Sequence, residues 1–166
     1  MTCGRTELHR VLPSPASSTQ QQRCCYIVFN TEDAEVEEGT EIESELRSLT
    51  GVIIDAALKV HRAFGPGLLE SAYEQCLAHE LTLRSVQVRR QVALPVEYEG
   101  LRLDAAYRLD LIVGESVIVE VKSVEALSRL HESQLLTYLK LSNIKLGLLI
   151  NFNVDLLKNG IRRLIL

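Results

Sequence analysis

The stretch that decides this fold runs from Leu109 to Lys122 and reads LDLIVGESVIVEVK. Two short apolar runs, typical of buried strands, flank a Gly-Glu pair that predicts a turn. Side chains alternate along a strand, so Glu120 and Lys122 share one face. A purely structural strand would place Val or Ile at both positions, because burying an ion costs several kcal/mol unless it is paired or binds a metal.

The connection between the two runs determines whether Asp110 meets Glu120. In an antiparallel pair these residues lie opposite each other in only one register. A two-residue turn between the strands would pair Val113 with Ser116 and misalign the two carboxylates. We therefore predict an odd-length connection or a β-bulge near residues 114–116.

In that register, Asp110, Glu120 and the backbone carbonyl of Val121 would coordinate a Mg²⁺ or Mn²⁺ ion that keeps several waters. Such an ion lowers the pKa of a bound water and screens the charge on a phosphate. Lys122 would orient the attacking water and stabilise the transition state electrostatically. The alternative is structural: a surface Glu120–Lys122 pair with Asp110 at a strand end. The spacing by itself leaves both interpretations open.

The surrounding pattern predicts further helices and strands. Apolar residues recur at three- and four-residue steps from Ile42 to Phe64, and Gly65-Pro66-Gly67 ends that helix. Another helix is expected over about 68–85 and a third over about 128–143. Strands are expected over about 86–98, 101–113, 116–123, 145–152 and 161–166. The order ααβββαββ predicts an α/β fold with a mixed β-sheet flanked by helices.

Length and charge divide the chain into two parts. The 166 residues are enough for one domain. Residues 1–45 hold three arginines and nine acidic residues, a net charge of −6, whereas residues 46–166 carry +2. Residues 1–25 also have few apolar groups and no period. We expect 1–45 to be a disordered or poorly ordered acidic leader and 46–166 to be the domain, whose charge admits a polyanionic partner.

The cysteines and the hydropathy exclude several classes of protein. The four cysteines form no Cys-x-x-Cys pair and have no nearby His at zinc-ligand spacing. A reducing, cytoplasmic setting is therefore expected. No stretch reaches the roughly 18–20 apolar residues of a membrane span, and residues 1–25 contain no apolar signal segment. We expect no association with a membrane.

Asp110 with Glu120-Val121-Lys122, after a hairpin and an acid-bearing helix, resembles the PD-(D/E)XK nuclease superfamily. The segment GLLESAY at residues 67–73 is similar to the signature of its small GxxExxY branch. The resemblance covers about residues 46–166. It departs from the family in one respect, because Leu109 stands where the proline is usual, and this leaves the carboxylate in place.

The resemblance implies a restriction-endonuclease-like fold and metal-dependent cleavage of phosphodiester bonds, with DNA rather than RNA as the expected substrate. It implies that Asp110 and Glu120 are metal ligands and that Lys122 is the catalytic lysine. Glu70 would be a further catalytic and metal-binding carboxylate that approaches from the preceding helix. The duller interpretation of Glu70 is an acid that compensates the helix dipole.

Three more residues are candidates for positioning the substrate: Gln134, Tyr138 and Tyr73. Gln134 and Tyr138 share a helical face and resemble the Gln-x-x-x-Tyr pair of RecB-type exonucleases. Gln134 is unusual on an otherwise apolar face, because a buried amide needs partners. For both tyrosines the alternative is a core aromatic with a hydrogen-bonded hydroxyl.

Two functions from different classes follow. The first is a metal-dependent nuclease. The second is a non-catalytic module with the nuclease fold that binds nucleic acid or a protein partner. A core of this size offers little surface around its cleft, which favours a homodimer or a protein partner in either case.

Overall fold

The computed structural model describes residues 27–29 and 41–166. Its elements are β1 (Ile27–Phe29), α1 (Glu41–Phe64), α2 (Glu70–Leu83), β2 (Val88–Tyr98), β3 (Leu101–Val113), β4 (Val117–Lys122), α3 (Arg129–Ser142), β5 (Leu146–Asn151), the 3₁₀ helix η1 (Leu157–Gly160) and β6 (Ile161–Ile165). From α1 onward, the helices and strands follow the predicted order.

Two elements of the structure begin inside the expected leader at 1–45. β1 lies within that segment and pairs with β6, and α1 starts at Glu41, just before the segment ends. A three-residue strand is too short to show a period, which explains why the sequence did not reveal β1. The rest of the expected leader, residues 1–26 and 30–40, lies outside the described residues.

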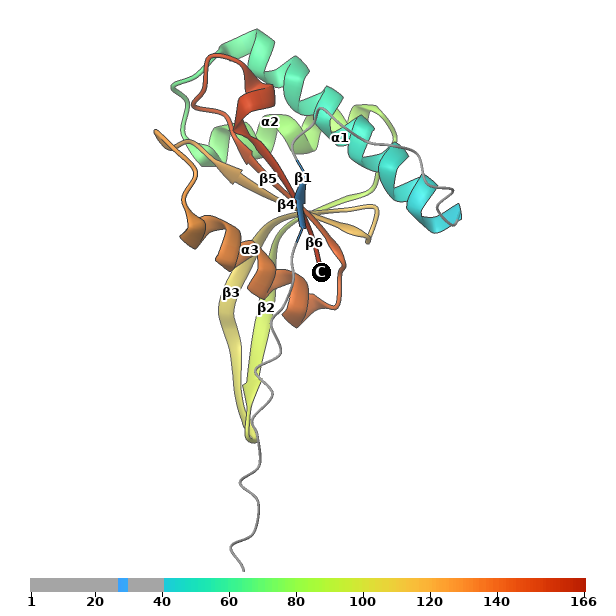
Figure 1. Cartoon of the computed structure of the whole chain (residues 1–166), viewed down its shortest axis with the longest axis vertical. Coiled ribbons are helices and arrows are strands. Elements are labelled where there is room, and N and C mark those ends of the chain that lie inside the picture. Colours follow the sequence, from blue (N-terminus) through green and yellow to red (C-terminus); the bar gives the residue numbers. More distant parts are fainter. Residues whose placement is uncertain (1–26, 30–40) are drawn as a thin grey trace, which may run out of the picture.

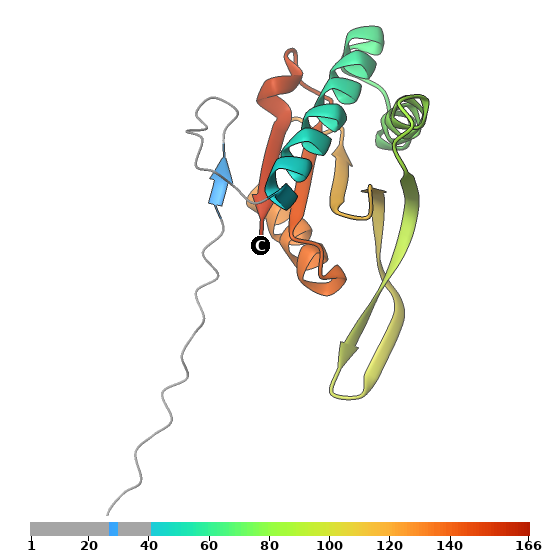
Figure 2. The same cartoon turned by 90° about the vertical axis from the view of Figure 1, so that its right-hand side faces the viewer.

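The strands form one six-stranded sheet in the order β1-β6-β5-β4-β3-β2. The β4–β5 pair is parallel and the other neighbouring pairs are antiparallel, which confirms the predicted mixed sheet. One apolar cluster joins α1 and α2 to one face, and a second joins α3 to the other. Figures 1 and 2 show the resulting three layers. In the part of the chain described, no helix has both the length and the apolar character needed to cross a membrane.

β4 is a central strand, and its side chains alternate between the two clusters. Val119 and Val121 pack with α1 and α2, whereas Ile118 packs with α3. By the same alternation, Glu120 and Lys122 lie on the face that α3 covers.

The connection between β3 and β4 has three residues, 114–116, as the odd-length prediction requires. The paired residues are Leu111 with Val119, Ile112 with Ile118, and Val113 with Val117. One further step in this register places Asp110 opposite Glu120, on the same face of the sheet.

β2 and β3 make a long hairpin that leaves the body of the protein as an arm (Figures 1 and 2). Its apolar stripe changes sides at Gln91 and Asp110. Side chains two residues apart on a regular strand lie on the same face. Here Leu111 of β3 packs in the cluster with α1 and α2, but Leu109 packs in the cluster with α3. Gln91 has φ 51° and interrupts the pairing with β3. Such an irregularity increases the local twist. The apolar side chains of the hairpin therefore turn from the cluster with α1 and α2 to the cluster with α3.

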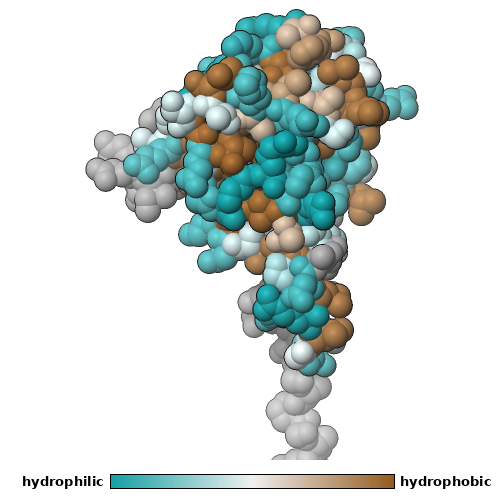
Figure 3. Space-filling model, turned by 180° about the vertical axis from the view of Figure 1, so that it is seen from behind, coloured by the Kyte–Doolittle hydropathy of each residue, from teal (hydrophilic) through white to brown (hydrophobic). Residues whose placement is uncertain are grey.

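Beyond α3, the arm keeps one exposed apolar face. Figure 3 shows hydrophobic side chains along one side of the arm and hydrophilic side chains beside them. The exposed apolar residues are Tyr98, Leu101, Leu103 and Tyr107. Tyr107 also packs edge-on against Tyr138 of α3, with ring centroids 5.4 Å apart, and so fixes the base of the arm beside α3.

The close approach of η1 to the end of β5 can be tested with Gly160→Ala. A Cβ at Gly160 would overlap the backbone carbonyl oxygen of Asn151, which cannot move aside without disturbing β5. We expect a loss of about 1–3 kcal/mol in the free energy of unfolding, measured by urea denaturation. The control, Gly51→Ala in α1, meets nothing within 4 Å and should gain up to about 1 kcal/mol. Equal stability of Gly160→Ala and wild type would contradict the described packing.

Candidate active site

The site lies at the C-terminal end of β4, where β3 and β4 separate. The backbone pairing stops at Leu111 and Val119, and beyond it the Asp110 Oδ2 accepts the Val121 N–H at 2.9 Å. The N–H and C=O of one strand residue point to the same side, so the Val121 carbonyl opens toward the same gap. The Asp110 carboxylate thus replaces a backbone partner and is fixed next to Glu120.

The buried Glu120 and the largely buried Lys122 form an ion pair. The Lys122 Nζ donates to the Glu120 Oε1 at 2.7 Å, and the two side chains are 13% and 5% exposed. The other oxygen, Glu120 Oε2, is buried without a hydrogen-bond partner among the described residues. An unsatisfied buried acceptor costs about 1–3 kcal/mol. The surface ion pair considered from the sequence therefore does not describe this arrangement.

Burial and neighbouring charges shift the pKa values of the three ionisable side chains at this site. Burial raises the pKa of Glu120 to about 7, and the negative charge of Asp110 adds to the rise. Burial also raises the pKa of Asp110, against the effect of its hydrogen bond from Val121. For Lys122, burial acts to lower the pKa, but the hydrogen bond and charge of Glu120 outweigh it and the pKa is raised. A bound cation would lower the pKa values of both acids and so favour their ionised forms.

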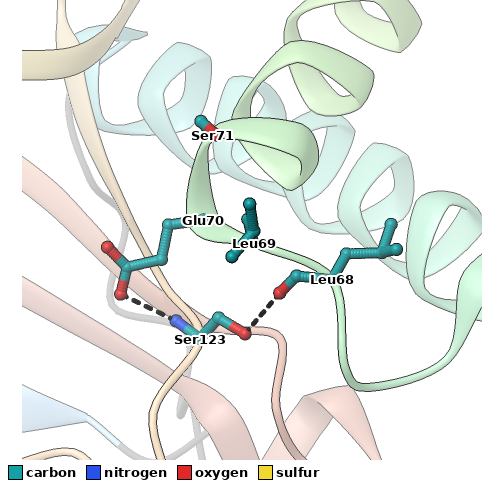
Figure 4. Close-up of a pocket in the computed structure, with 5 residues that line it drawn as sticks. All are labelled: Leu68, Leu69, Glu70, Ser71 and Ser123. Carbon is teal, nitrogen blue, oxygen red and sulfur yellow. Dashed lines mark hydrogen bonds between the residues drawn. The ribbon is translucent and has the colours of Figure 1, made fainter.

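Helix α2 brings Glu70 to the end of β4. The Glu70 Oε1 accepts the Ser123 N–H at 2.9 Å, and the Ser123 Oγ donates to the Leu68 carbonyl at 2.7 Å (Figure 4). An open hollow of about 500 Å³ lies here, lined by Leu68, Leu69, Glu70, Ser71 and Ser123. The charge of Glu70 also contributes to the raised pKa values of Asp110 and Glu120.

The residues present fit a divalent cation at Asp110 and Glu120. Two carboxylates meet there, one with an unpartnered buried oxygen, and carboxylate oxygens are the ligands that Mg²⁺ and Mn²⁺ prefer. In the part of the chain that the structure describes, no three His, Cys, Asp or Glu side chains converge closely enough to hold an ion. Glu70, held on the Ser123 N–H, is therefore not brought into the same group.

Helix α3 presents its Gln-x-x-x-Tyr pair to the same face. The Gln134 Nε2 donates to the Tyr138 Oη, and Tyr138 is 2% exposed. Burial raises the pKa of Tyr138, and the Glu120 charge adds to the rise, so this hydroxyl lies within the field of the site. The helix begins at a capping box of Ser128 and His131, which sets its start.

The structure does not bring Tyr73 to the site. Its ring is fully buried and stacks on Phe152, with centroids 4.5 Å apart. Its hydroxyl donates to the Gly65 carbonyl and accepts the Leu68 N–H. Tyr73 therefore holds the loop before α2, in line with the core-aromatic alternative.

Two residues beside Asp110 escaped sequence reasoning: Glu74 and Gln91. The neighbouring Arg90 was expected only as a possible phosphate contact. Glu74 is 4% exposed and accepts hydrogen bonds from Arg90 Nε at 2.9 Å and from Gln91 Nε2 at 2.6 Å. The same Gln91 Nε2 donates to Asp110 Oδ1 at 3.4 Å. For Glu74, the sequence did contain one indication. Glu70 and Glu74 are four residues apart, which places both acids on one face of α2.

Comparison with protein families agrees with this geometry. The family model described as the PD-(D/E)XK nuclease superfamily matches residues 47–164, and the chain belongs to that superfamily. Its mixed six-stranded sheet between helices is consistent with a restriction-endonuclease-like fold. Comparison with curated proteins and with solved structures found no match. Membership indicates nuclease chemistry, nucleic-acid binding in general and the use of divalent metals typical of the superfamily.

The raised pKa of Glu120 predicts a pH dependence of stability in EDTA. The folded state binds the proton more tightly than the unfolded state, so the free energy of unfolding falls as pH rises from about 4.5 to about 7. Glu120→Gln should make this fall shallower, by an amount on the order of 1–3 kcal/mol over the window. Urea denaturation at several pH values measures it. The control Glu97→Gln, at an exposed side chain, should keep the wild-type profile; a wild-type profile in Glu120→Gln would contradict the burial of this acid.

Proposed function

We propose that this chain is a Mg²⁺- or Mn²⁺-dependent nuclease of the GxxExxY branch that hydrolyses phosphodiester bonds, in DNA rather than RNA. The observation that supports it most is the buried Glu120 Oε2 beside Asp110, which has no hydrogen-bond partner in the part of the chain that the structure describes. A purely structural domain would gain by replacing a buried ion pair with apolar residues of similar volume. Membership of the superfamily supplies the class of reaction.

Asp110 and Glu120 would hold the metal, with the Val121 carbonyl as a further ligand. When bound, the ion lowers the pKa of a coordinated water and compensates charge on the phosphate. The protein's own contribution is to place both carboxylates before the ion arrives. Asp110 is held by the Val121 N–H, and Glu120 is held through Oε1 by Lys122.

Lys122 supplies a fixed positive charge at the reacting centre. Its pKa is raised by Glu120, so it stays protonated, and only 13% of its side chain is exposed. A preorganised ammonium in a partly dry site stabilises developing negative charge without the cost of reorganising water. We therefore assign Lys122 to orient the attacking water and to stabilise the phosphorane-like charge.

Glu70, Gln134 and Tyr138 would complete the site. The hollow that Glu70 lines is large enough for part of a nucleotide strand. Glu70 would reach the metal only after leaving the Ser123 N–H. Gln134 and Tyr138 would contact the substrate from α3. Tyr73 is left out of the contacting residues because its ring stacks on Phe152 and its hydroxyl bonds the Gly65 carbonyl and the Leu68 N–H.

A cleavage assay tests the proposal. Purified protein is incubated with supercoiled plasmid, linear and single-stranded DNA, and RNA, in Mg²⁺, in Mn²⁺ and in EDTA. We expect cleavage of DNA with either metal and none in EDTA. Asp110→Asn and Lys122→Met should each lower the rate by about 100-fold or more, because each removes a charge that acts on the transition state.

Two control variants remove the same kinds of charge at positions away from the site. Asp104→Asn lies on the arm with its side chain 79% exposed, and Lys140→Met lies on an exposed position of α3. Both should cleave like wild type. Undiminished cleavage by Lys122→Met would overturn the assignment of roles. A folded wild type that binds DNA but cleaves nothing would favour the non-catalytic module instead. The homodimer or protein partner stays a prediction.

The α3 pair should affect substrate binding more than chemistry. Gln134→Leu removes the amide but keeps a side chain of similar size, and one lost hydrogen bond is worth about 0.5–1.5 kcal/mol. We expect KM for DNA to rise by up to about tenfold while kcat changes less, measured by steady-state kinetics in saturating Mn²⁺. A fall in kcat as large as that of Asp110→Asn would instead place Gln134 in the chemical step.

A further inference from the structure

The Asp110 carboxylate is held by two neutral donors. Val121 N–H binds Oδ2 at 2.9 Å, and the Gln91 amide reaches Oδ1 at 3.4 Å. A lysine or arginine in the place of Gln91 would bind Asp110 more strongly, but its charge would compete with a metal ion for the same oxygen. A neutral donor restrains the carboxylate and leaves its charge available.

The Gln91 amide lies between two carboxylates, Asp110 and Glu74. Ionised carboxylates only accept hydrogen bonds, so a group shared between them must donate twice. The NH₂ of an amide is an uncharged group with two hydrogens, one for each acid. Its contact with Glu74 Oε2 is the shorter one, 2.6 Å, and Glu74 is 4% exposed. Gln91 is itself exposed, so the buried Glu74 anchors an amide that water would otherwise compete for.

The cation of this network, Arg90, pairs with Glu74 and not with Asp110. Arg90 Nε donates to Glu74 Oε1 at 2.9 Å, whereas the Gln91 amide binds the other oxygen, Oε2. Adjacent strand residues normally point to opposite faces, yet Arg90 and Gln91 reach the same carboxylate. The left-handed backbone of Gln91, φ 51°, breaks the alternation and makes this possible. For a residue with a Cβ this conformation costs roughly 1–2 kcal/mol, and such strain concentrates at functional sites.

We propose that Gln91, anchored by Glu74, is a positioning residue that orients the Asp110 carboxylate toward the divalent cation. This inference rests on the proposed nuclease function. The χ2 torsion of an aspartate is broad, so without a donor on Oδ1 the carboxylate can rotate about its bond to Val121. Each Asp110 oxygen now has one donor among the described residues and keeps a lone pair for the cation.

The variant that isolates the amide is Gln91→Gly. Glycine adopts positive φ without strain, so the backbone is kept while the side chain is removed. The matched control is Glu99→Gly at the tip of the arm, where φ is also positive, 45°, and the exposed side chain is far along the hairpin from Asp110. The free energy of unfolding of both variants in EDTA checks that neither is destabilised.

Mn²⁺ affinity is measured by isothermal titration calorimetry without DNA, and kcat and KM are measured in saturating Mn²⁺. We expect Gln91→Gly to bind Mn²⁺ about 10–100-fold more weakly and to lower kcat, with KM for DNA unchanged. Glu74→Gln should have a similar effect. The double variant should be no worse than either single one, because the two residues act on Asp110 as one unit. Glu99→Gly should match wild type.

The outcomes separate this inference from the proposed function. A wild type that neither binds Mn²⁺ nor cleaves DNA overturns both. A wild type that does both, with a Gln91→Gly variant equal to it in Mn²⁺ affinity and kcat, overturns the positioning role alone. Additive losses in Gln91→Gly and Glu74→Gln would show that Glu74 does not act through the amide.

Discussion

The hydrogen bond from the Val121 N–H to the Asp110 carboxylate joins the fold to the site. The backbone pairing of β3 with β4 stops at Leu111 and Val119. A buried strand N–H beyond that point would be costly without a partner. Because a side chain satisfies it, the strands can separate without that cost. The separation lets the Asp110 carboxylate, instead of a backbone carbonyl, lie beside Glu120. The same carboxylate thus ends the ladder and supplies half of the candidate metal site.

Charge is distributed unevenly around this opening. Four acids lie near it, and two have cationic partners: Glu74 pairs with Arg90, and Glu120 pairs through one oxygen with Lys122. Glu70 accepts a backbone N–H, and Asp110 has neutral donors. Asp110 and Glu120 thus lie close together with one cation, Lys122, acting on both, and burial raises both pKa values. A divalent cation would be stabilised most at that point.

The residues missed from the sequence show where pattern reasoning fails. A regular hairpin that pairs Tyr98 with Leu101 would put Gln91 opposite Arg108. The register shift between Leu94 and Val96 moves Gln91 opposite Asp110 instead. Alternation of apolar residues is unchanged by a shift of two, so the sequence shows no trace of it. Tyr73 raises a different question, because an aromatic suits a substrate contact or a core equally well. Its stacking on Phe152 and its hydrogen bonds to Gly65 and Leu68 fit the core alternative.

The sequence by itself determined the order of the elements, the faces of the β4 residues and the odd-length connection that aligns Asp110 with Glu120. These follow from periods of two and 3.6 residues, which are local properties of the backbone. Only the tertiary structure decided that one Glu120 oxygen has no partner among the described residues, that Lys122 is largely buried and that Glu74 reaches Asp110 through Gln91. Burial and hydrogen bonding depend on which neighbours α2 and the arm bring from distant parts of the chain, and no local period encodes them.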